Sequence, residues 1–567
     1  MPTPTELHER VRAWIDDDPD PGTAAELTDV LTRARAGDAG AEADLADRFA
    51  GLLQFGTAGL RGRLGGGPAR MNRAVVIRAA AGLSAHLWRV LGAAPTVVIG
   101  FDARHGSAVF ARDTAEIVAA AGGRALLFDA TCPTPLLAFA VRQLEADAGV
   151  MVTASHNPPR DNGYKVYLGG RASDVAGRGV QIVPPADAEI AAAIAAVPSV
   201  AAVDRSEESA RANGGSISIV GPELVDAYVA AAIGSGGDAA ATPAGLRIVL
   251  TPMHGVGGAV ATRVLAEAGF ENVTLVAEQA EPDPDFPTVA FPNPEEPGAL
   301  DLAIATARAA GADLIIANDP DADRVSIAVP AGDGWRQLTG DEVGALLGEY
   351  LGSRTETGVF ANSIVSSRLL ERIAADHGLE HRTTLTGFKW ISRTPGLVYG
   401  YEEALGYCVD PDRVRDKDGI TAGLAIARLA EESARAGRTL ADLLDDLARR
   451  HGLYATAPLS VRMADLADIP AAMTRLRGQG PATLAGSPVT SAIDLAGGGD
   501  LPPTDGLVYL TESGDRVVVR PSGTEPKIKC YLEVVLPVTG EVAPVRERAA
   551  ERLARLSTDI AAAAGIG

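Results

Sequence analysis

The residues of this chain that could do chemistry begin with a serine and a histidine at the end of an apolar segment. Residues 148–152 have the length and β-branched content of a buried strand, and Ser155 and His156 follow within four positions. A strand-like pattern resumes at 164–167 and carries Lys165. We therefore expect a hairpin that brings these polar groups together. They are the parts of an activated nucleophile, although a purely structural Ser-His turn explains the motif alone equally well.

Three aspartates form a second candidate. The apolar segment 312–318 ends in Asp319, Asp321 and Asp323 at alternate positions. Three carboxylates in one short loop repel each other, and a divalent cation removes that cost, with Mg²⁺ the best match to hard oxygen ligands. An EF-hand is excluded because Arg324 stands where that loop needs glycine. The D-x-D-x-[TV] spacing of an aspartyl-phosphate enzyme does begin at Asp321, so an aspartyl nucleophile remains an alternative, with a solvated acidic turn as the third.

Two loops have the composition of phosphate-binding sites. The segment 520–526 follows a predicted strand and combines a guanidinium fork with hydroxyls and free amides, in Arg520, Ser522, Gly523 and Thr524. The segment 56–62 contains three glycines and Arg61, whose planar fork suits a phosphate. A capped turn and a plain glycine-rich loop are the respective structural alternatives.

A pair of glutamates and a bias in lysine usage add further candidates. Glu402 and Glu403 lie beside aromatic residues on a loop bounded by glycines, which suits sugar hydroxyls, although glutamates at a helix N-terminus would look the same. Lysine can release its proton in a protein, whereas arginine cannot. Of 51 basic residues only five are lysines, and all fall in candidate motifs: Lys165, Lys389, Lys417, Lys527 and Lys529.

Composition limits the class of protein. The chain has 567 residues with 47% hydrophobic and 22% charged residues, which predicts three or four globular domains. The net charge of −22 argues against nucleic acid or an anionic membrane as partner. No apolar run has transmembrane length, and the N-terminus lacks a basic region followed by an apolar core, so we expect a cytoplasmic protein, monomer or dimer. The three cysteines are too scattered for a disulfide framework or a zinc site.

The alternation of strands and helices indicates the domain organisation. It restarts near residues 95, 247 and 358, and from about residue 456 gives way to a less regular mixture. Residues 1–50 are predicted to form a helical lead-in, and residues 170–215, rich in Ala, Pro and Ser, a linker with helical pieces. We therefore predict an α/β protein with three similar mixed-sheet α/β domains and a smaller C-terminal α+β domain around a central cleft. The predicted domains, which carry the serine, aspartate, glutamate and phosphate loops in that order, are 1–215, 216–330, 331–455 and 456–567. A dinucleotide site at 254–258 is disfavoured because the third glycine of G-x-G-x-x-G is missing.

The set of motifs, in this order, resembles the α-D-phosphohexomutase superfamily over nearly the whole chain. Its most specific pieces are Thr153–Pro158, Asp319–Arg324 and Arg520–Thr524. The segments most similar to the branch of certain bacterial phosphoglucomutases and phosphopentomutase-type enzymes are Gly56–Arg61, Asp161–Lys165 and Gly400–Ala404. The glutamate loop departs from the G-E-E-S and G-E-M-S forms of other members, so the sugar is left open.

The resemblance implies a mechanism and a role for each motif. Ser155 would carry a phosphoryl group and, with the three aspartates, hold Mg²⁺. The sugar phosphate would dock on the Arg520 loop, Glu402 and Glu403 would bind its hydroxyls, and a hexose 1,6-bisphosphate would be both intermediate and activator. Proton transfer would fall to Lys165 and Lys389 assisted by His156, while Arg61 and Arg324 steady charge.

The function that follows is a phosphosugar mutase interconverting glucose 1-phosphate and glucose 6-phosphate, an intramolecular phosphotransferase. A phosphomannomutase or phosphopentomutase with the same mechanism is the alternative. An aspartyl-phosphate phosphotransferase and a sugar-phosphate sensor without catalysis are the remaining hypotheses.

Overall fold

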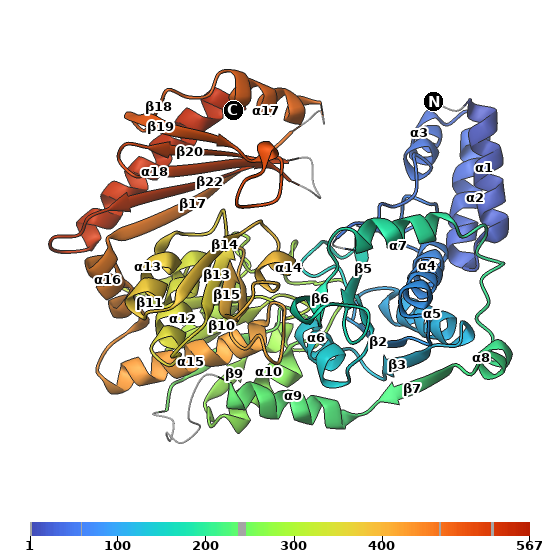
Figure 1. The fold of residues 1–567 in the computed structure, drawn as a ribbon, viewed down its shortest axis with the longest axis horizontal. Coiled ribbons are helices and arrows are strands. Elements are labelled where there is room, and N and C mark those ends of the chain that lie inside the picture. Colours follow the sequence, from blue (N-terminus) through green and yellow to red (C-terminus); the bar gives the residue numbers. More distant parts are fainter. Residues whose placement is uncertain (1–2, 58, 236–244, 464–466, 523–526, 567) are drawn as a thin grey trace. The chain divides into compact units, whose positions relative to one another are not determined.

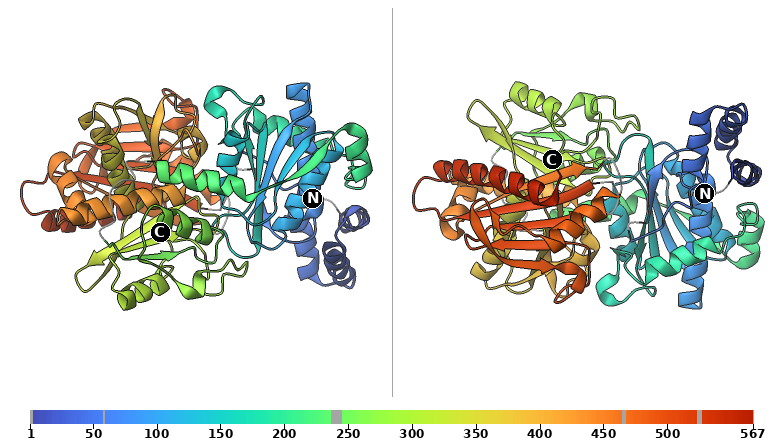
Figure 2. Two further views of the ribbon diagram at one scale, coloured as in Figure 1. Left: turned by 90° about the horizontal axis from the view of Figure 1, so that it is seen from below. Right: turned by 90° about the horizontal axis from the view of Figure 1, so that it is seen from above.

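The computed structural model describes residues 3–57, 59–235, 245–463, 467–522 and 527–566. The chain divides into two units (Figures 1 and 2). Unit 1 comprises residues 1–337 and 406–427, and unit 2 comprises residues 338–405 and 428–567.

Unit 1 begins with three short helices, as the sequence predicts for residues 1–50. They are α1 (Pro4–Asp17), α2 (Pro21–Arg35) and α3 (Ala39–Arg48). Thr3 starts the first helix through a capping box with Glu6, which satisfies two amides that the helix itself cannot bond. Leu27 and Leu45 are fully buried in the small core that the three helices share.

The first sheet of unit 1 contains both parallel and antiparallel strand pairs. Its strands, in the order β1-β5-β4-β2-β3-β7, are β1 (Leu60–Arg63), β5 (Asp161–Leu168), β4 (Ala148–Val152), β2 (Thr96–Phe101), β3 (Arg124–Phe128) and β7 (Ser216–Val220), with β6 (Val180–Gln181) beside β5. The serine loop follows the C-terminal end of one of the central strands, β4. β4 and β5 pair antiparallel with Met151 opposite Lys165, which is the predicted hairpin. Because β7 pairs with β3, this sheet extends past residue 215, where the sequence pattern places the first boundary.

Helices cover this sheet and position the loops at its strand ends. They are α4 (Arg73–Leu91), α5 (Ser107–Ala120), α6 (Thr134–Gln143), α7 (Ala186–Ala195) and α8 (Glu207–Asn213). α7 packs so closely on α4 that a Cβ at Gly82 would lie 2.6 Å from the backbone nitrogen of Ile194. Residues 170–215, which resemble a linker in sequence, therefore belong to this packed domain. By length and composition α4 could cross a membrane, but 61% of its most apolar stretch is buried, and its apolar face belongs to the domain core.

The second sheet of unit 1 carries the aspartate loop. Its order is β12-β11-β10-β8-β9, with β8 (Ile248–Thr251), β9 (Val273–Leu275), β10 (Leu314–Asn318), β11 (Val325–Ala331) and β12 (Gly334–Gln337). The accompanying helices are α9 (Pro222–Gly234), α10 (Gly258–Glu267) and α11 (Asp301–Ala310). The three aspartates lie in the turn between β10 and β11. β16 (Gly406–Cys408) and the first turns of α15 (Gly419–Arg435) also belong to unit 1.

Unit 2 contains a third α/β sheet and a last, antiparallel sheet (Figure 1). The third sheet has the parallel strands β14 (Glu380–Thr384), β13 (Val359–Ser363) and β15 (Leu397–Glu402), with α12 (Gly340–Gly352), α13 (Leu369–Asp376) and α14 (Phe388–Ile391). After α16 (Leu440–His451) comes the order β17-β22-β21-β20-β19-β18, with bounds Leu453–Arg462, Lys527–Leu536, Arg516–Pro521, Leu507–Thr511, Ser487–Asp494 and Thr483–Leu484. α17 (Asp468–Gly478) and α18 (Ala543–Ala564) pack with this sheet. The predicted fold class is confirmed.

Candidate active site

The serine that the sequence singles out lies buried against the aspartate loop. The Ser155 hydroxyl donates to Oδ2 of Asp319 at 2.8 Å and lies 3.1 Å from Nδ1 of His156. Its backbone has a φ of 53°, in the left-handed region that non-glycine residues seldom adopt. Such strain persists only where surrounding contacts enforce it, and it is typical of functional sites.

Arg104 supplies the contacts that hold the serine loop in this conformation. One terminal nitrogen of its guanidinium donates to the carbonyls of Ser155 and Asn157, both at 2.6 Å. The other terminal nitrogen donates to the carbonyl of Pro158 at 2.8 Å. Asp102 lies 3.3 Å from Nε of the same guanidinium and orients it. Sequence reasoning assigned Arg104 no role, although its position just after a buried strand is the signal that could have found it.

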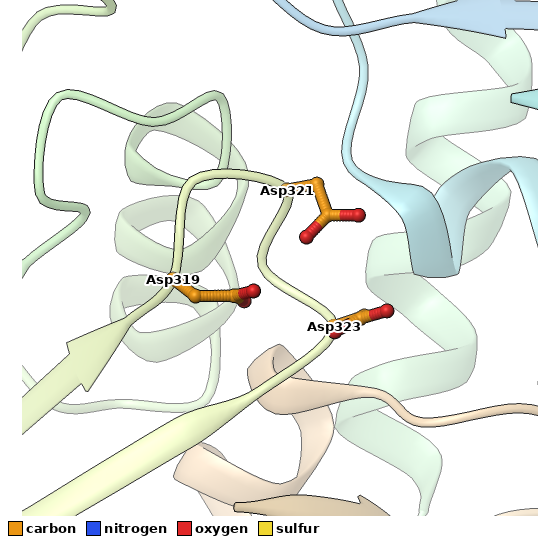
Figure 3. A group of neighbouring side chains, drawn as sticks. All are labelled: Asp319, Asp321 and Asp323. Atoms are coloured by element: carbon orange, nitrogen blue, oxygen red, sulfur yellow. The ribbon is translucent and has the colours of Figure 1, made fainter. Parts of the chain in front are cut away.

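The three aspartates form a group that could hold a metal ion (Figure 3). The carboxylates of Asp319, Asp321 and Asp323 project from one turn, all are buried, and one oxygen from each lies within 4.8 Å of the others. Oδ1 of Asp321 and Oδ1 of Asp323 are buried without a hydrogen-bond partner among the described residues. Since buried carboxylate oxygens are costly unless bonded, these residues fit a divalent cation.

Cationic and hydroxyl groups of unit 1 surround the aspartates. Lys165 Nζ lies 2.7 Å from Oδ2 of Asp321 and 3.0 Å from Oδ2 of Asp323. Lys417 Nζ lies 3.1 Å from the same oxygen of Asp323. Thr134, at the start of α6, donates its hydroxyl to Oδ2 of Asp321 at 2.6 Å. The structure therefore brings Lys165 and a second candidate of the lysine bias, Lys417, to the aspartates, and it adds Thr134, to which sequence reasoning gave no role.

The electrostatics of the loop differ from one carboxyl to the next. Burial, followed by the charges of Asp321 and Asp323, raises the pKa of Asp319 well above its usual value. Burial would also raise the pKa of Asp321, but Lys165 outweighs it and holds that pKa far below the usual range. The pKa of Lys165 is raised, since the two aspartates outweigh the effect of burial.

Three further predicted site residues lie around the same loop. Burial, followed by the charges of Arg324 and Arg61, lowers the pKa of His156 well below its usual value. Nη1 of Arg61 donates to Oδ1 of Asn157 at 3.2 Å, which ties the glycine-rich loop to the serine loop. The backbone nitrogen of Arg324 donates to Oδ1 of Asp319 at 3.0 Å.

The glycines at 254–258 have a packing role beneath the aspartate loop. A Cβ on Gly255 would lie 2.4 Å from the backbone of Pro320, and a Cβ on Gly257 would lie 2.5 Å from the side chain of Ala322. A larger residue at Gly255 would displace the turn that carries the aspartates. Close backbone approach therefore explains a loop that only superficially resembles a dinucleotide motif.

In unit 2 the glutamate loop is held by two serines. Oε2 of Glu403 accepts hydrogen bonds from the hydroxyls of Ser366 at 2.8 Å and Ser363 at 3.1 Å. Burial, and then the charge of Asp341, raises the pKa of Glu403. Glu402, one position earlier, ends β15.

A buried charge network connects these serines to the last sheet. Glu533 on β22 accepts from the hydroxyl of Ser367 at 2.9 Å and from the backbone nitrogen of Arg368 at 2.8 Å. Arg516 on β21 lies 3.5 Å from Glu533, and its guanidinium donates to the carbonyl of Ser366 at 2.5 Å. The last domain thus supports the backbone of the turn that binds Glu403.

The predicted phosphate loop lies near the glutamates within unit 2. Burial and then Glu403 raise the pKa of Tyr531, while Arg520, which also hydrogen-bonds to it, acts in the opposite direction. The Tyr531 hydroxyl therefore interacts electrostatically with residues of both the glutamate loop and the phosphate loop. The backbone nitrogen of Ser522 donates to the backbone carbonyl of Lys527 at 2.8 Å. The predicted catalytic residue Lys389 lies on α14. Gly523 and Thr524 lie outside the described residues.

Comparison with known proteins decides the family. The phosphoglucomutase/phosphomannomutase α/β/α domains I, II and III match residues 52–200, 226–332 and 339–451, and the C-terminal domain of that family matches residues 459–551. This chain belongs to that family. It is a phosphosugar mutase, an intramolecular phosphotransferase.

Relatives of this mutase carry three different sugar names. A probable phosphomannomutase from Haemophilus influenzae is 47% identical, over 82% of this chain and 93% of the relative. A probable phosphoribomutase from Schizosaccharomyces pombe is 36% identical over 93% of each chain. A phosphoglucomutase from Staphylococcus haemolyticus is 35% identical, over 85% of this chain and 90% of the relative.

Solved structures agree with the fold of the mutase. A structure from Thermus thermophilus has a TM-score of 0.67 at 27% identity, covering 90% of this chain and 98% of that one. A phosphoglucomutase/phosphomannomutase family protein from Burkholderia thailandensis has a TM-score of 0.66 at 23% identity, covering 90% and 96%.

Proposed function

We propose that this mutase interconverts glucose 1-phosphate and glucose 6-phosphate by passing a phosphoryl group to and from Ser155. The observation that carries the proposal is the hydrogen bond of 2.8 Å between the Ser155 hydroxyl and Asp319, within the buried aspartate group. A nucleophile in contact with a metal-ligand set is the arrangement that phosphoryl transfer requires.

The aspartates and Ser155 supply the ligands for Mg²⁺. Asp319, Asp321 and Asp323 offer carboxylate oxygens, and an oxygen of phosphorylated Ser155 completes the set. When bound, Mg²⁺ neutralises charge on the transferring phosphoryl group. Lys165 and Lys417 offset part of the carboxylate charge.

The transfer itself exchanges one oxygen–phosphorus bond for another. A free hydroxyl of the sugar phosphate forms a bond to phosphorus while the bond to Ser155 Oγ breaks, and the product is the hexose 1,6-bisphosphate. After the intermediate reorients, its other phosphoryl returns to Ser155. The same bisphosphate supplied from solution rephosphorylates the serine and so acts as activator.

Each half-reaction moves a proton between the sugar hydroxyl and the protein. We assign this transfer to Lys165 and Lys389, with His156 assisting beside Ser155. Arg61 and Arg324 steady the charge on the phosphoryl oxygens.

Unit 2 supplies recognition of the rest of the substrate. Glu402 and Glu403 bind sugar hydroxyls, and Ser363 and Ser366 hold Glu403 in place for this purpose. The existing phosphate docks on Arg520 and Ser522 together with Gly523 and Thr524. We propose that these groups and Ser155 act on one substrate molecule; a cleft shared by the domains, a cytoplasmic location and a monomeric or dimeric state stay predictions.

Mannose and pentose phosphates are the second candidates. The relative named for mannose is 47% identical to this chain and the one named for ribose 36%, against 35% for the one named for glucose. The small Ala404 after the glutamate pair also leaves the sugar open, because no serine hydroxyl is present there to bind the ring. The aspartyl-phosphate alternative is left to the Ser155→Ala experiment, because Oδ2 of Asp321 is bonded to Lys165 and Thr134 whereas its Oδ1 has no partner among the described residues.

The test compares kcat/KM for glucose 1-phosphate, mannose 1-phosphate and ribose 1-phosphate with Mg²⁺ and trace hexose 1,6-bisphosphate. A clear lead for glucose 1-phosphate supports the proposal. A lead for another sugar keeps the mechanism and changes the substrate. No turnover of any of them, with tight binding and no phosphoryl group in the intact mass, would establish a sensor instead.

A further inference from the structure

A cavity in unit 1 lies at the opposite end of the first sheet from Ser155. It has a volume of about 650 Å³ and opens to solvent. Thr96, which begins β2, and Asp147, which directly precedes β4, line it, whereas Ser155 follows the other end of β4. Five strand residues separate the two ends, on the order of 17 Å. The cavity is therefore distinct from the catalytic site.

The wall of the cavity contains a guanidinium held by carbonyls. Arg142, near the end of α6, donates from Nη1 to the carbonyl of Arg178 at 2.7 Å and from Nη2 to the carbonyl of Asp412 at 3.0 Å. Among the described residues it forms no ion pair within 4.0 Å of a carboxylate. Burial and then the charge of Arg415 lower the pKa of Arg142, against the opposing charges of Asp412 and Asp410. A guanidinium that is bonded only to backbone carbonyls keeps its positive charge without a counter-ion, and an anion can supply that counter-ion.

Two more arginines lie at the rim. Arg178 and Arg413 are exposed and line the same cavity, and neither forms an ion pair in the part of the chain that the structure describes. Of the acidic lining residues, Asp147 is neutralised by a two-point ion pair with Arg171 at 2.7 and 3.0 Å. Glu145 and Asp412 are exposed at the edge, where solvent screens them.

The cavity also has an apolar part. Phe139 and Val141 of α6 line it beside the arginines. Apolar walls with a few convergent charged groups are typical of a site for a small organic anion. The cavity volume is in the range expected for a site that binds one drug-sized or nucleotide-sized molecule.

Three elements extend from the cavity to the catalytic site. α6 carries Arg142 near its end and begins at Thr134, which contacts Asp321. β5 carries Lys165 and runs into Gly169, which lines the cavity. The third element is the segment between Asp412 and Lys417, which reaches from the cavity to Asp323.

We infer that this cavity binds a small phosphorylated molecule, with its phosphate on Arg142, Arg178 and Arg413, and that binding alters the catalytic site through these three elements. The binding site stands independently of the reaction assigned to the protein. The effect on turnover rests on the proposed mutase function.

The experiment measures binding of AMP and of inorganic phosphate to the full chain by calorimetry, with adenosine as the control without phosphate. The test variant is the double substitution R178A/R413A, which removes exposed side chains outside the catalytic site. The matched control is R12A/R35A, which removes the same charge from exposed positions of α1 and α2. The titrations are repeated on R520A, which removes the proposed phosphate contact of the catalytic site, so that binding retained by R520A reports the second site.

The inference predicts that AMP or phosphate binds once per chain. Adenosine, which lacks the phosphate, should bind at least about tenfold more weakly than AMP. R178A/R413A should weaken binding about tenfold or more, whereas R12A/R35A should leave it unchanged. A Kd that is the same in all three proteins, or no binding of either anion, would overturn the site. Mutase kcat/KM should respond to AMP in the unsubstituted protein and not in R178A/R413A, whose basal activity stays normal. Binding without that response refutes the coupling alone, and absence of basal turnover in every protein refutes the mutase assignment.

Discussion

The hydroxyl of Ser155 donates a hydrogen bond of 2.8 Å to Oδ2 of Asp319, although 164 positions separate the two residues. The bond joins the ends of two strands that belong to different sheets of unit 1. It places the proposed phosphoryl carrier directly against the proposed metal ligands.

Ser155→Ala should abolish turnover. Without the hydroxyl no phosphoserine forms, and we expect kcat to fall roughly a thousandfold or more. Intact mass after incubation with glucose 1,6-bisphosphate should show one phosphoryl group on the unsubstituted protein and none on the variant. The exposed serine variant Ser353→Ala should retain both properties. Near-normal turnover of Ser155→Ala, with an acid-stable phosphoserine absent and an acyl phosphate at Asp321 present, would establish the aspartyl route.

Asp321→Asn should weaken the response to Mg²⁺. The change keeps the shape of the side chain and removes one of three negative charges, so we expect the Mg²⁺ concentration for half-maximal activity to rise about tenfold or more. Activity measured across a Mg²⁺ titration gives this value. Asp333→Asn, at an exposed position of the turn between β11 and β12, is the matched control. If Asp321→Asn and Asp333→Asn respond identically, the aspartate group is not the metal site.

Glu533→Gln should loosen the support of the glutamate loop. It leaves Arg516 and Arg368 without a buried counter-charge, and breaking such a pair costs about 3 kcal/mol or more of unfolding free energy. Because the turn that holds Glu403 loses its anchor, KM for the sugar phosphate should rise more than kcat falls. Chemical denaturation and steady-state kinetics measure the two effects. Glu551→Gln, exposed on α18, should change neither, and an unaltered KM in Glu533→Gln would limit Glu533 to a stabilising role.

His86 should make unit 1 less stable in mild acid. Burial and then the charge of Arg89 lower the pKa of its imidazole. Below the unfolded value of about 6.5 the unfolded chain therefore binds more protons than the folded one, so stability falls as pH decreases from that value towards the folded pKa, by at most about 1.4 kcal/mol per pH unit. Above about pH 6.5 this contribution vanishes.

Thermal midpoints at pH 7.5 and 5.5 test this expectation. His86→Gln, which cannot take up the proton, should lose less stability between the two pH values than the unsubstituted protein. Equal losses in the two proteins would show that His86 does not contribute to acid sensitivity.

Local sequence was sufficient for the fold class and for the loops. The hairpin of β4 and β5 follows from two apolar segments with a turn between them, and the aspartate turn follows from a buried strand that ends in three carboxylates. Periodicity, turn residues and repelling charges act over a few residues, so they can be interpreted without coordinates.

Only the tertiary structure decided which groups meet. Arg104 clamps the serine loop, Thr134 and Lys417 contact the aspartates, and Glu533 supports the turn that holds Glu403. These partners are far apart in the chain, and apart from Lys417, which the rarity of lysine singles out, each is a common residue type in an ordinary segment. Their proximity results from sheet order and packing, which depend on many weak contacts at once, and no local pattern records it.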